Sequence, residues 1–309
     1  MTEITSQFVE VENLRLHFLQ AQPQNSIYRS NQPTILFLHG FPEHSGVWKS
    51  QLSYFGQQYQ TLALDLPGYN LSQAPFDLTG FSVPSLVKII AAFIQNVSPD
   101  KPIVLVAHDW GGALAWPLTN RFPELIDKLV ILNAAHPSTF TREMISNRQQ
   151  RLLSDYIHTF LVPEAEQRLI KNRFAELKAH SIDNVRVKLS EQDITDYERA
   201  WSQPNAVTNM LNYYRAMPQL FPREGSVGSN LEGSPEKPLD SIKVPHIDIS
   251  VPTLVLWGEQ DQAFDIDVLN GLADYIADYQ EYRFADASHW LHHEKPEEVN
   301  QAIDLFLRR

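Results

Sequence analysis

The chain of 309 residues is long enough to bury a large hydrophobic core, either as one domain with a sizeable insertion or as two domains. Its 43% hydrophobic and 20% charged residues are typical of a soluble globular protein, and the lack of cysteine excludes disulfides, thiol catalysis and thiolate metal sites. A formal net charge of −12 argues against nucleic acid and anionic membranes as partners and mildly disfavours anionic substrates.

The N-terminal residues do not look like a targeting segment. Residues 1–7 lack the basic and then apolar layout of a signal peptide, and no apolar run in the chain approaches the length of a membrane span. We therefore expect a cytoplasmic protein.

The first part of the chain alternates strand and helix patterns. Residues 8–20 predict a pair of strands, and a short apolar strand at 34–38 ends in the segment His-Gly-Phe-Pro-Glu at 39–43. Another strand is expected at 61–65, followed by a helix at 81–97 whose apolar residues recur at helical spacing. This succession predicts a parallel sheet that is covered by helices on both faces.

The segment 102–113 is the one around which the rest of the chain is organised. Residues 103–107 are apolar and too few for a helix, but they suit a strand buried on both faces, and residues 113–118 have the spacing of the buried side of a helix. The residues around Asp109 are small, as a sharp turn requires: Ala107, Gly111 and Gly112. This pattern is that of a nucleophile elbow with an aspartate in the place of the nucleophile.

Asp109 would lie at the start of a helix, where free N–H groups and the helix dipole favour negative charge. It would therefore stay ionised and could attack an electrophile. The alternative is that Asp109 only caps the helix, because aspartate is a favoured N-cap residue.

Gly40 directly follows a strand and lets the backbone approach closely, so Phe41 could present its N–H group to the site. Together with the N–H of Trp110 it would form a two-donor oxyanion hole. A simple turn would have the same sequence.

The pattern changes after a further strand expected at 128–133. From about residue 138 to 222 there is no strand-like run, only helical periodicity, and the apolar positions fall in two pieces: Leu152, Leu153, Tyr156 and Phe160, and Val207, Met210, Leu211, Tyr214 and Met217. The sheet resumes at 252–258, a last strand lies near 282–284, and an amphipathic helix from Pro296 ends the chain.

These patterns predict an α/β fold with a mostly parallel sheet, helices on both faces and an inserted helical cap. Residues 1–137 would form the first part of the core and 138–223 the cap. Residues 224–250 would be a long connecting loop, and 251–309 the second part of the core.

Asp109, Asp261 and His289 stand after successive predicted strands, in the order nucleophile, acid and histidine. Because the carboxyl ends of parallel strands meet at one edge of a sheet, these residues should converge, and their order is that of the alpha/beta hydrolases. The strand before Asn133 is followed by no carboxylate, which favours Asp261 as the acid. Three nearby carboxylates keep this assignment open: Asp265, Asp267 and Asp286. A turn aspartate and a packed core histidine are the structural alternatives.

His292 and His293 are expected on the solvated side of the final segment. With no third ligand at metal spacing, we expect no metal there, and nothing in the chain calls for a cofactor.

The chain resembles alpha/beta hydrolases of the epoxide hydrolase type from about residue 8 to the C-terminus. The motifs that carry the resemblance are His39-Gly-Phe-Pro, Asp65-Leu-Pro-Gly-Tyr, His108-Asp-Trp-Gly-Gly, Asn212-Tyr-Tyr-Arg, Leu256-Trp-Gly-Glu-Gln-Asp and Ser288-His-Trp. Ala107 departs from the glycine that family members often have there, and the connection 224–250 is unusually long.

The resemblance implies a covalent mechanism. Asp109 would attack an epoxide carbon and form an ester, whose carbonyl the oxyanion hole would polarise. Neutral His289, oriented by Asp261, would then activate water. Tyr156 and Tyr214 of the cap would donate to the epoxide oxygen, with Tyr213 and Tyr197 as the substitutes.

A dehalogenase with the same nucleophile is the nearest alternative, and the indole of Trp110 could then bind halide. However, the haloalkane type commonly has Asn or Trp at the position of Phe41, and a haloacetate enzyme would have arginines where Trp110 and Ala113 stand. A serine esterase is unlikely because the elbow has no serine, and a ligand-binding protein without catalysis is the alternative from another class. We expect a small, neutral and largely apolar substrate, and a monomer or homodimer.

Overall fold

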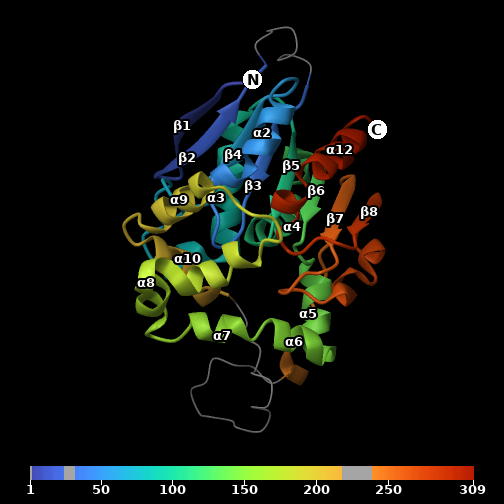
Figure 1. Cartoon of the computed structure of the whole chain (residues 1–309). Coiled ribbons are helices and arrows are strands. Elements are labelled where there is room, and N and C mark those ends of the chain that lie inside the picture. Colours follow the sequence, from blue (N-terminus) through green and yellow to red (C-terminus); the bar gives the residue numbers. More distant parts are fainter. Residues whose placement is uncertain (1, 24–31, 218–238) are drawn as a thin grey trace.

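A single mixed sheet forms the centre of the molecule (Figure 1). The structure is a computed structural model that describes residues 2–23, 32–217 and 239–309. In these residues the strand order is β1-β2-β4-β3-β5-β6-β7-β8, with β2 antiparallel to both of its neighbours and parallel pairing from β4 to β8. The strands are β1 (Ile4–Val11), β2 (Leu14–Ala21), β3 (Ile35–Leu38), β4 (Thr61–Leu64), β5 (Ile103–His108), β6 (Ile126–Leu132), β7 (Thr253–Gly258) and β8 (Tyr279–Phe284).

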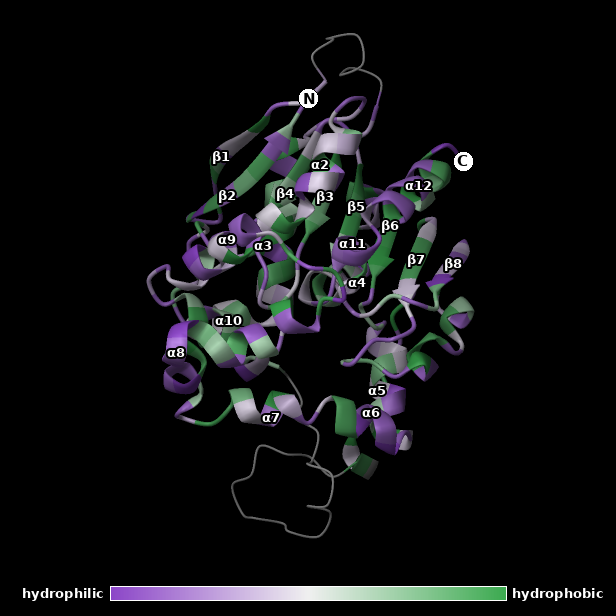
Figure 2. Cartoon of the chain, viewed as in Figure 1, coloured by the Kyte–Doolittle hydropathy of each residue, from purple (hydrophilic) through white to green (hydrophobic). Residues whose placement is uncertain are grey.

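The central strands are continuous apolar runs because both of their faces are covered. Every residue of β3, β4, β5 and β7 is buried, and these strands appear hydrophobic in Figure 2. Alternate residues enter different cores: Leu36 and Leu38 belong to one cluster, Ile35 and Phe37 to the other. The predicted parallel sheet with two covered faces is confirmed.

Two pairs of helices cover these faces. Helices α3 (Val83–Val97) and α4 (Trp110–Arg121) supply the larger cluster, and α2 (Lys49–Phe55) and α12 (Pro296–Leu307) supply the smaller one. A short helix, α11 (Leu291–Glu294), precedes α12. Short 3-10 turns connect these elements at Ser45–Trp48, Leu78–Phe81, Pro123–Leu125, Ile182–Asn184, Leu239–Ser241, Ile266–Leu269 and Leu272–Asp274.

The described residues between β6 and β7 form helices and no further named strand, and Figure 1 shows most of these helices beyond the carboxyl ends of the parallel strands. They are α5 (Pro137–Ser146), α6 (Arg148–Leu153), α7 (Tyr156–Phe160), α8 (Ala165–Ala179), α9 (Glu191–Trp201) and α10 (Ala206–Arg215), with α8 interrupted at 171–174. No helix in the described part of the chain is long and apolar enough to cross a membrane.

Two details of the predicted helical segment are wrong. The piece that contains Leu152 and Phe160 is two helices, because the chain leaves the helix at Ser154, whose hydroxyl oxygen accepts a hydrogen bond from the Gln150 amide over 2.9 Å. Met217 lies beyond the end of α10.

The predicted connection 224–250 can be compared with the structure only at its end, because residues 224–238 lie outside the described residues, as do residues 218–223 of the predicted cap. In the described part, Leu239–Ser241 form a turn and Ile249 pairs with Ile276. The end of this connection is therefore joined to the body of the molecule.

We predict that Gly111→Ala destabilises the fold by roughly 1–3 kcal/mol, as expected for overpacking. A Cβ atom there would lie 2.6 Å from the carbonyl oxygen of Leu38, and this backbone atom cannot move aside as a side chain can. Urea denaturation would measure the loss. Ser53→Ala, on an exposed position of α2, is the control and should change stability by less than about 0.5 kcal/mol. Equal midpoints for the two variants would contradict the prediction.

Candidate active site

Asp109 lies in a strained turn between β5 and α4, with φ 47° and ψ −118°. The turn is possible because neighbouring backbones come unusually close. A Cβ atom on Gly40 would lie 2.3 Å from the Cβ of Asp109, and one on Gly112 would lie 2.2 Å from the Cβ of Ala134. The glycines are therefore required by packing as well as by the turn.

The side chain of Asp109 does not cap the helix that it precedes. Asp109 occupies the N-cap position, but its carboxylate makes no capping hydrogen bond. Instead, the N–H of Phe41 donates to Oδ1 over 2.6 Å, and Oδ2 lies 3.7 Å from Nε2 of His289. The interpretation of Asp109 as a simple helix cap is wrong, because its Oδ1 accepts the N–H of Phe41 in the loop after β3 and its carboxylate accepts no N–H of α4.

Asp261 holds the other side of the His289 ring. Its Oδ2 lies 2.8 Å from Nδ1 of His289 and also accepts a hydrogen bond from the Asn133 amide over 2.7 Å. Oδ1 accepts from the N–H groups of Ala263 and Phe264 over 2.7 and 3.1 Å. The structure thus brings Asp109, His289 and Asp261 together in the order that the sequence predicted.

The other candidate acids are engaged elsewhere. The carboxylate of Asp265 accepts from the N–H of Asp267 and caps a turn, and Asp286 forms an ion pair with Lys295. Asp261 is the carboxylate that contacts His289 through Nδ1.

The two carboxylates change the protonation of His289. Burial alone would lower its pKa, but the charge and hydrogen bond of Asp261 and the charge of Asp109 raise the pKa to about 9. Burial would raise the pKa of Asp261, but His289 and Asn133 hold it below its usual value. A pKa of about 9 favours the imidazolium form of His289 at neutral pH. The neutral imidazole predicted from the sequence belongs to the later step, in which His289 activates water, and it stays a prediction.

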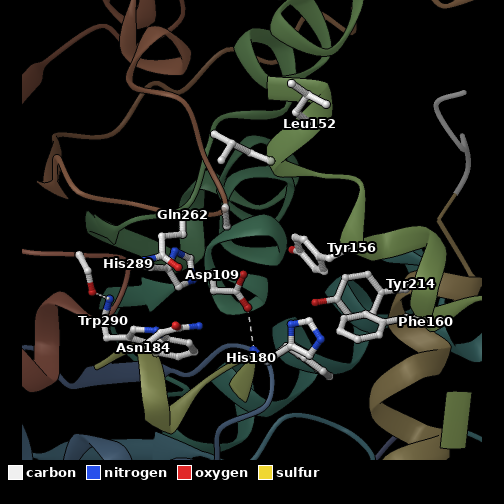
Figure 3. A pocket seen from close by; sticks show the side chains of 14 residues that line it. Asp109, Leu152, Tyr156, Phe160, His180, Asn184, Tyr214, Gln262, His289 and Trp290 are labelled. Carbon is white, nitrogen blue, oxygen red and sulfur yellow. Dashed lines mark hydrogen bonds and ion pairs between the residues drawn. The ribbon is translucent and has the colours of Figure 1, made fainter. Parts of the chain in front are cut away.

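Two phenols face Asp109 across a cavity of about 310 Å³ (Figure 3). Figure 3 shows the hydroxyl groups of Tyr156 and Tyr214 pointing toward the carboxylate. Burial and then the nearby negative charge of Asp109 raise the pKa of Tyr156, and burial raises that of Tyr214. Both phenols therefore keep their protons at neutral pH.

The substitute tyrosines point elsewhere. The hydroxyl of Tyr213 donates to the carbonyl oxygen of Pro67 over 2.8 Å, and that of Tyr197 donates to Glu43 over 2.9 Å. Tyr213 and Tyr214 are adjacent on α10, so the turn of the helix sends their rings in different directions.

Of the two predicted oxyanion donors, Phe41 directs its N–H at Asp109, as described above. Trp110 is the first residue of α4, and its indole ring packs edge-on against Tyr214 with ring centroids 5.2 Å apart. Its ring therefore forms one wall between Asp109 and α10.

A second, smaller cavity of about 100 Å³ also reaches Asp109. It is lined mainly by apolar side chains, among them Trp110, Phe140, Ile157 and Phe264. The larger cavity carries polar groups that the sequence analysis missed: His180, Asn184 and Gln262. No motif marked these three, because their position depends on how the helices after β6 pack.

Asn133 is a further residue whose part in the site was missed. Its amide holds Asp261 and also bonds the backbone of Gly258, and its φ of 37° is a conformation that asparagine tolerates. The available signal was an asparagine directly after a central strand, at the edge where the site lies.

The prediction that His292 and His293 lie on a solvated side of the final segment is wrong. His292 is 2% exposed, His293 is half-buried, and Nε2 of each lies close to Oε1 of Glu43, at 3.1 and 2.9 Å. Burial would raise the pKa of Glu43, but His292 and the hydrogen bonds from His108, His292 and His293 hold it well below its usual value. Sequence spacing could not reveal this group, because Glu43 comes from the loop after β3.

Known proteins are similar to this chain over most of its length. The family described as alpha/beta hydrolase fold matches residues 33–296. Epoxide hydrolase 3 of Xenopus tropicalis is 32% identical over 303 residues, 96% of this chain and 75% of its own, and human epoxide hydrolase 4 is 30% identical, covering 97% and 77%. The crystal structure of a Bacillus megaterium epoxide hydrolase with an inhibitor has a TM-score of 0.83 and 30% identity, covering 98% of this chain and 100% of that one.

We predict that Asp109→Asn lowers the pKa of His289 from about 9 toward its ordinary value, because one of the two carboxylates that favour the imidazolium is neutralised. NMR titration of histidine-labelled protein would measure the shift, with the resonance assigned by comparison with His289→Gln.

Asp265→Asn is the matched control. It neutralises a carboxylate four residues from Asp261 that caps a turn, and it should leave the His289 titration in place. If both variants titrate like the unchanged chain, Asp109 does not act on the imidazole.

Proposed function

Because the chain belongs to the alpha/beta hydrolase fold family and is an enzyme of its epoxide hydrolase-like branch, we propose that it opens epoxides to vicinal diols through an ester on Asp109. The observation that carries the proposal is the pair of phenols, Tyr156 and Tyr214, facing a carboxylate across one cavity. Epoxide opening needs both, because the carbon must be attacked while the departing oxygen receives a proton.

In the first step, Oδ2 of Asp109 attacks an epoxide carbon. The oxygen Oδ1 is held by the N–H of Phe41 and becomes the carbonyl oxygen of the ester. The carbon–oxygen bond of the ring breaks, its electrons go to the epoxide oxygen, and a tyrosine proton moves to that oxygen. The raised pKa values of Tyr156 and Tyr214 keep this proton in place until charge develops.

In the second step, water releases the ester. Forming the ester removes the negative charge of Asp109, which is one of the causes that raise the pKa of His289, so the imidazole more readily loses its proton. The proton that His289 loses replaces the one that the tyrosine gave to the epoxide oxygen, so the phenol is restored. Neutral His289 then takes a proton from water, and the hydroxide attacks the ester carbon.

The tetrahedral intermediate places negative charge on Oδ1 of Asp109. The N–H of Phe41 already points at this atom, and we assign the N–H of Trp110 as the second donor. Asp261 stays ionised, since four donors hold its two oxygens, and it keeps Nδ1 of His289 protonated. Collapse of the intermediate breaks the bond between Cγ and Oδ2 of Asp109, and Oδ2 leaves with the diol. The hydroxyl that came from water gives its proton to this leaving oxygen, which restores Asp109 as a carboxylate.

The cavities support a neutral, largely apolar substrate. The smaller cavity offers aromatic and aliphatic walls to one substituent of the epoxide, and the larger one is also lined by polar groups. We assign residues 138–223 as the cap, and the described part of this segment, up to residue 217, contributes to the lining of both cavities. A cytoplasmic location, the absence of nucleic-acid and membrane partners, and a monomeric or dimeric state stay predictions from composition.

One prediction of the proposed mechanism concerns the ester. With enzyme in excess in oxygen-18 water, one turnover of an aryl epoxide should place the label in the peptide that contains Asp109 and leave the first diol unlabelled. Mass spectrometry of the peptide and the diol would measure both. Direct attack of water on the epoxide would give the opposite pattern, with labelled diol and an unlabelled peptide.

Variants sharpen this experiment. Asp109→Asn should abolish turnover, and His289→Gln should accumulate a peptide that carries the mass of the substrate, because the ester forms but is not hydrolysed. Release of halide from chloroalkanes, tested in parallel, separates the dehalogenase alternative. Faster halide release than diol formation would favour that alternative.

Another prediction of the proposed mechanism concerns the two phenols, Tyr156 and Tyr214. Tyr156→Phe and Tyr214→Phe should each lower kcat/KM for an epoxide by about 10²–10⁴-fold, the range expected for loss of a general acid, and the double variant should lower it further. Tyr213→Phe is the matched control, since its hydroxyl bonds Pro67 outside the site. Equal activity of the Tyr213 and Tyr214 variants would remove the phenol from the mechanism.

A further inference from the structure

A group of buried polar side chains lies outside the active-site cavities. It consists of Glu43 from the loop after β3, His292 and His293 from α11, and Tyr197 from α9. Glu43, His292 and Tyr197 are each at most 2% exposed. We call these four residues the Glu43 cluster, and none of them has a role in the reaction proposed above.

The four polar atoms of the Glu43 cluster converge on one point. Oε1 of Glu43 lies 3.1 Å from Nε2 of His292, 2.9 Å from Nε2 of His293 and 2.9 Å from the hydroxyl oxygen of Tyr197. The Tyr197 oxygen and Nε2 of His293 are 3.1 Å apart. The carboxylate and imidazole ligand atoms all lie within 4.8 Å of one another.

Hydrogen bonds alone satisfy this arrangement poorly. His292, His293 and Tyr197 would each have to donate a hydrogen to the same carboxylate oxygen, which has only two lone pairs in its plane. A cation at the centre resolves the conflict, because it is bound by the lone pairs of both imidazoles and of the carboxylate.

From this geometry we propose that the Glu43 cluster binds a divalent zinc ion. Two imidazoles and one carboxylate form a ligand set that zinc commonly uses, and the phenol of Tyr197 stands at the fourth position. Zinc bonds of 2.0–2.1 Å place neighbouring ligand atoms of a tetrahedron about 3.3 Å apart. The four separations given above, 2.9–3.1 Å, need to widen by only a few tenths of an ångström, and the ligand atoms of the two imidazoles lie within 4.8 Å of each other.

The site has an entry path and joins separate parts of the chain. A cavity of about 230 Å³ reaches His292, His293 and Tyr197, and Lys49 and Asp196 at its wall form an ion pair. Helix α9 already contacts the loop after β3 through the Trp201 indole, which donates to the Pro42 carbonyl over 2.6 Å. Bound zinc would strengthen this docking of α9 onto the core, so its role would be structural.

The test uses the full chain, freed of any purification tag and dialysed against a chelator. Calorimetric titration with zinc chloride should show one ion per chain, and zinc should raise the melting temperature. His293→Gln should weaken binding at least tenfold, since the glutamine amide can still donate to Glu43 but offers no imidazole lone pair. His246→Gln, an exposed histidine that pairs with Asp248, is the matched control and should bind as the unchanged chain does.

A second measurement needs no variant. Cobalt(II) added to the metal-free chain should give the intense visible absorption of a tetrahedral site, and zinc should displace it. The proposal is overturned if the unchanged chain shows no saturable zinc binding, if His293→Gln binds equally tightly, or if cobalt shows only the weak absorption of the hydrated ion. Because the readouts are binding and stability, the outcome does not depend on whether the chain hydrolyses epoxides.

Discussion

The whole site depends on the close approach of two loops, in which the N–H of Phe41 donates to Asp109 over 2.6 Å. Only a residue without a side chain fits at position 40, where a Cβ would overlap Asp109. The approach keeps Asp109 at a positive φ, which costs a non-glycine residue about 1–3 kcal/mol. The burial of β5 and the packing of α4 hold it there, so the core maintains the strain at Asp109.

The two carboxylates beside His289 differ in how fully they are bonded. Asp261 accepts hydrogen bonds on both oxygens from two side chains and two backbone N–H groups, which fixes its charge and position. Asp109 has one oxygen held by Phe41, while the other faces the imidazole at 3.7 Å. The less fully bonded carboxylate suits the proposed role of nucleophile, since fewer hydrogen bonds must be broken when it forms a covalent bond.

The sequence was most informative where local pattern and position coincide. Continuous apolar runs predict buried parallel strands, and a residue directly after such a strand must reach the edge of the sheet, which located Asp109, Asp261 and His289. The directions of Tyr213 and Tyr214 were open, because both suit the apolar side of α10 and only tertiary packing sends one hydroxyl to Pro67. The break at Ser154 has the same origin, since Gln150 bonds Ser154 and also the distant carbonyl of Ala263.

The burial of His292 and His293 was beyond reach of the sequence because it depends on Glu43, a carboxylate in a motif that otherwise belongs to the active-site loop. The structure also links Glu43 to the active site. Oε2 of Glu43 lies 3.1 Å from Nδ1 of His108, and Nε2 of His108 lies 2.9 Å from the carbonyl oxygen of His289. A buried carboxylate outside the cavity is thus connected through the imidazole of His108 to the backbone of His289. Anything that fixes Glu43 therefore also fixes the loop that carries His289.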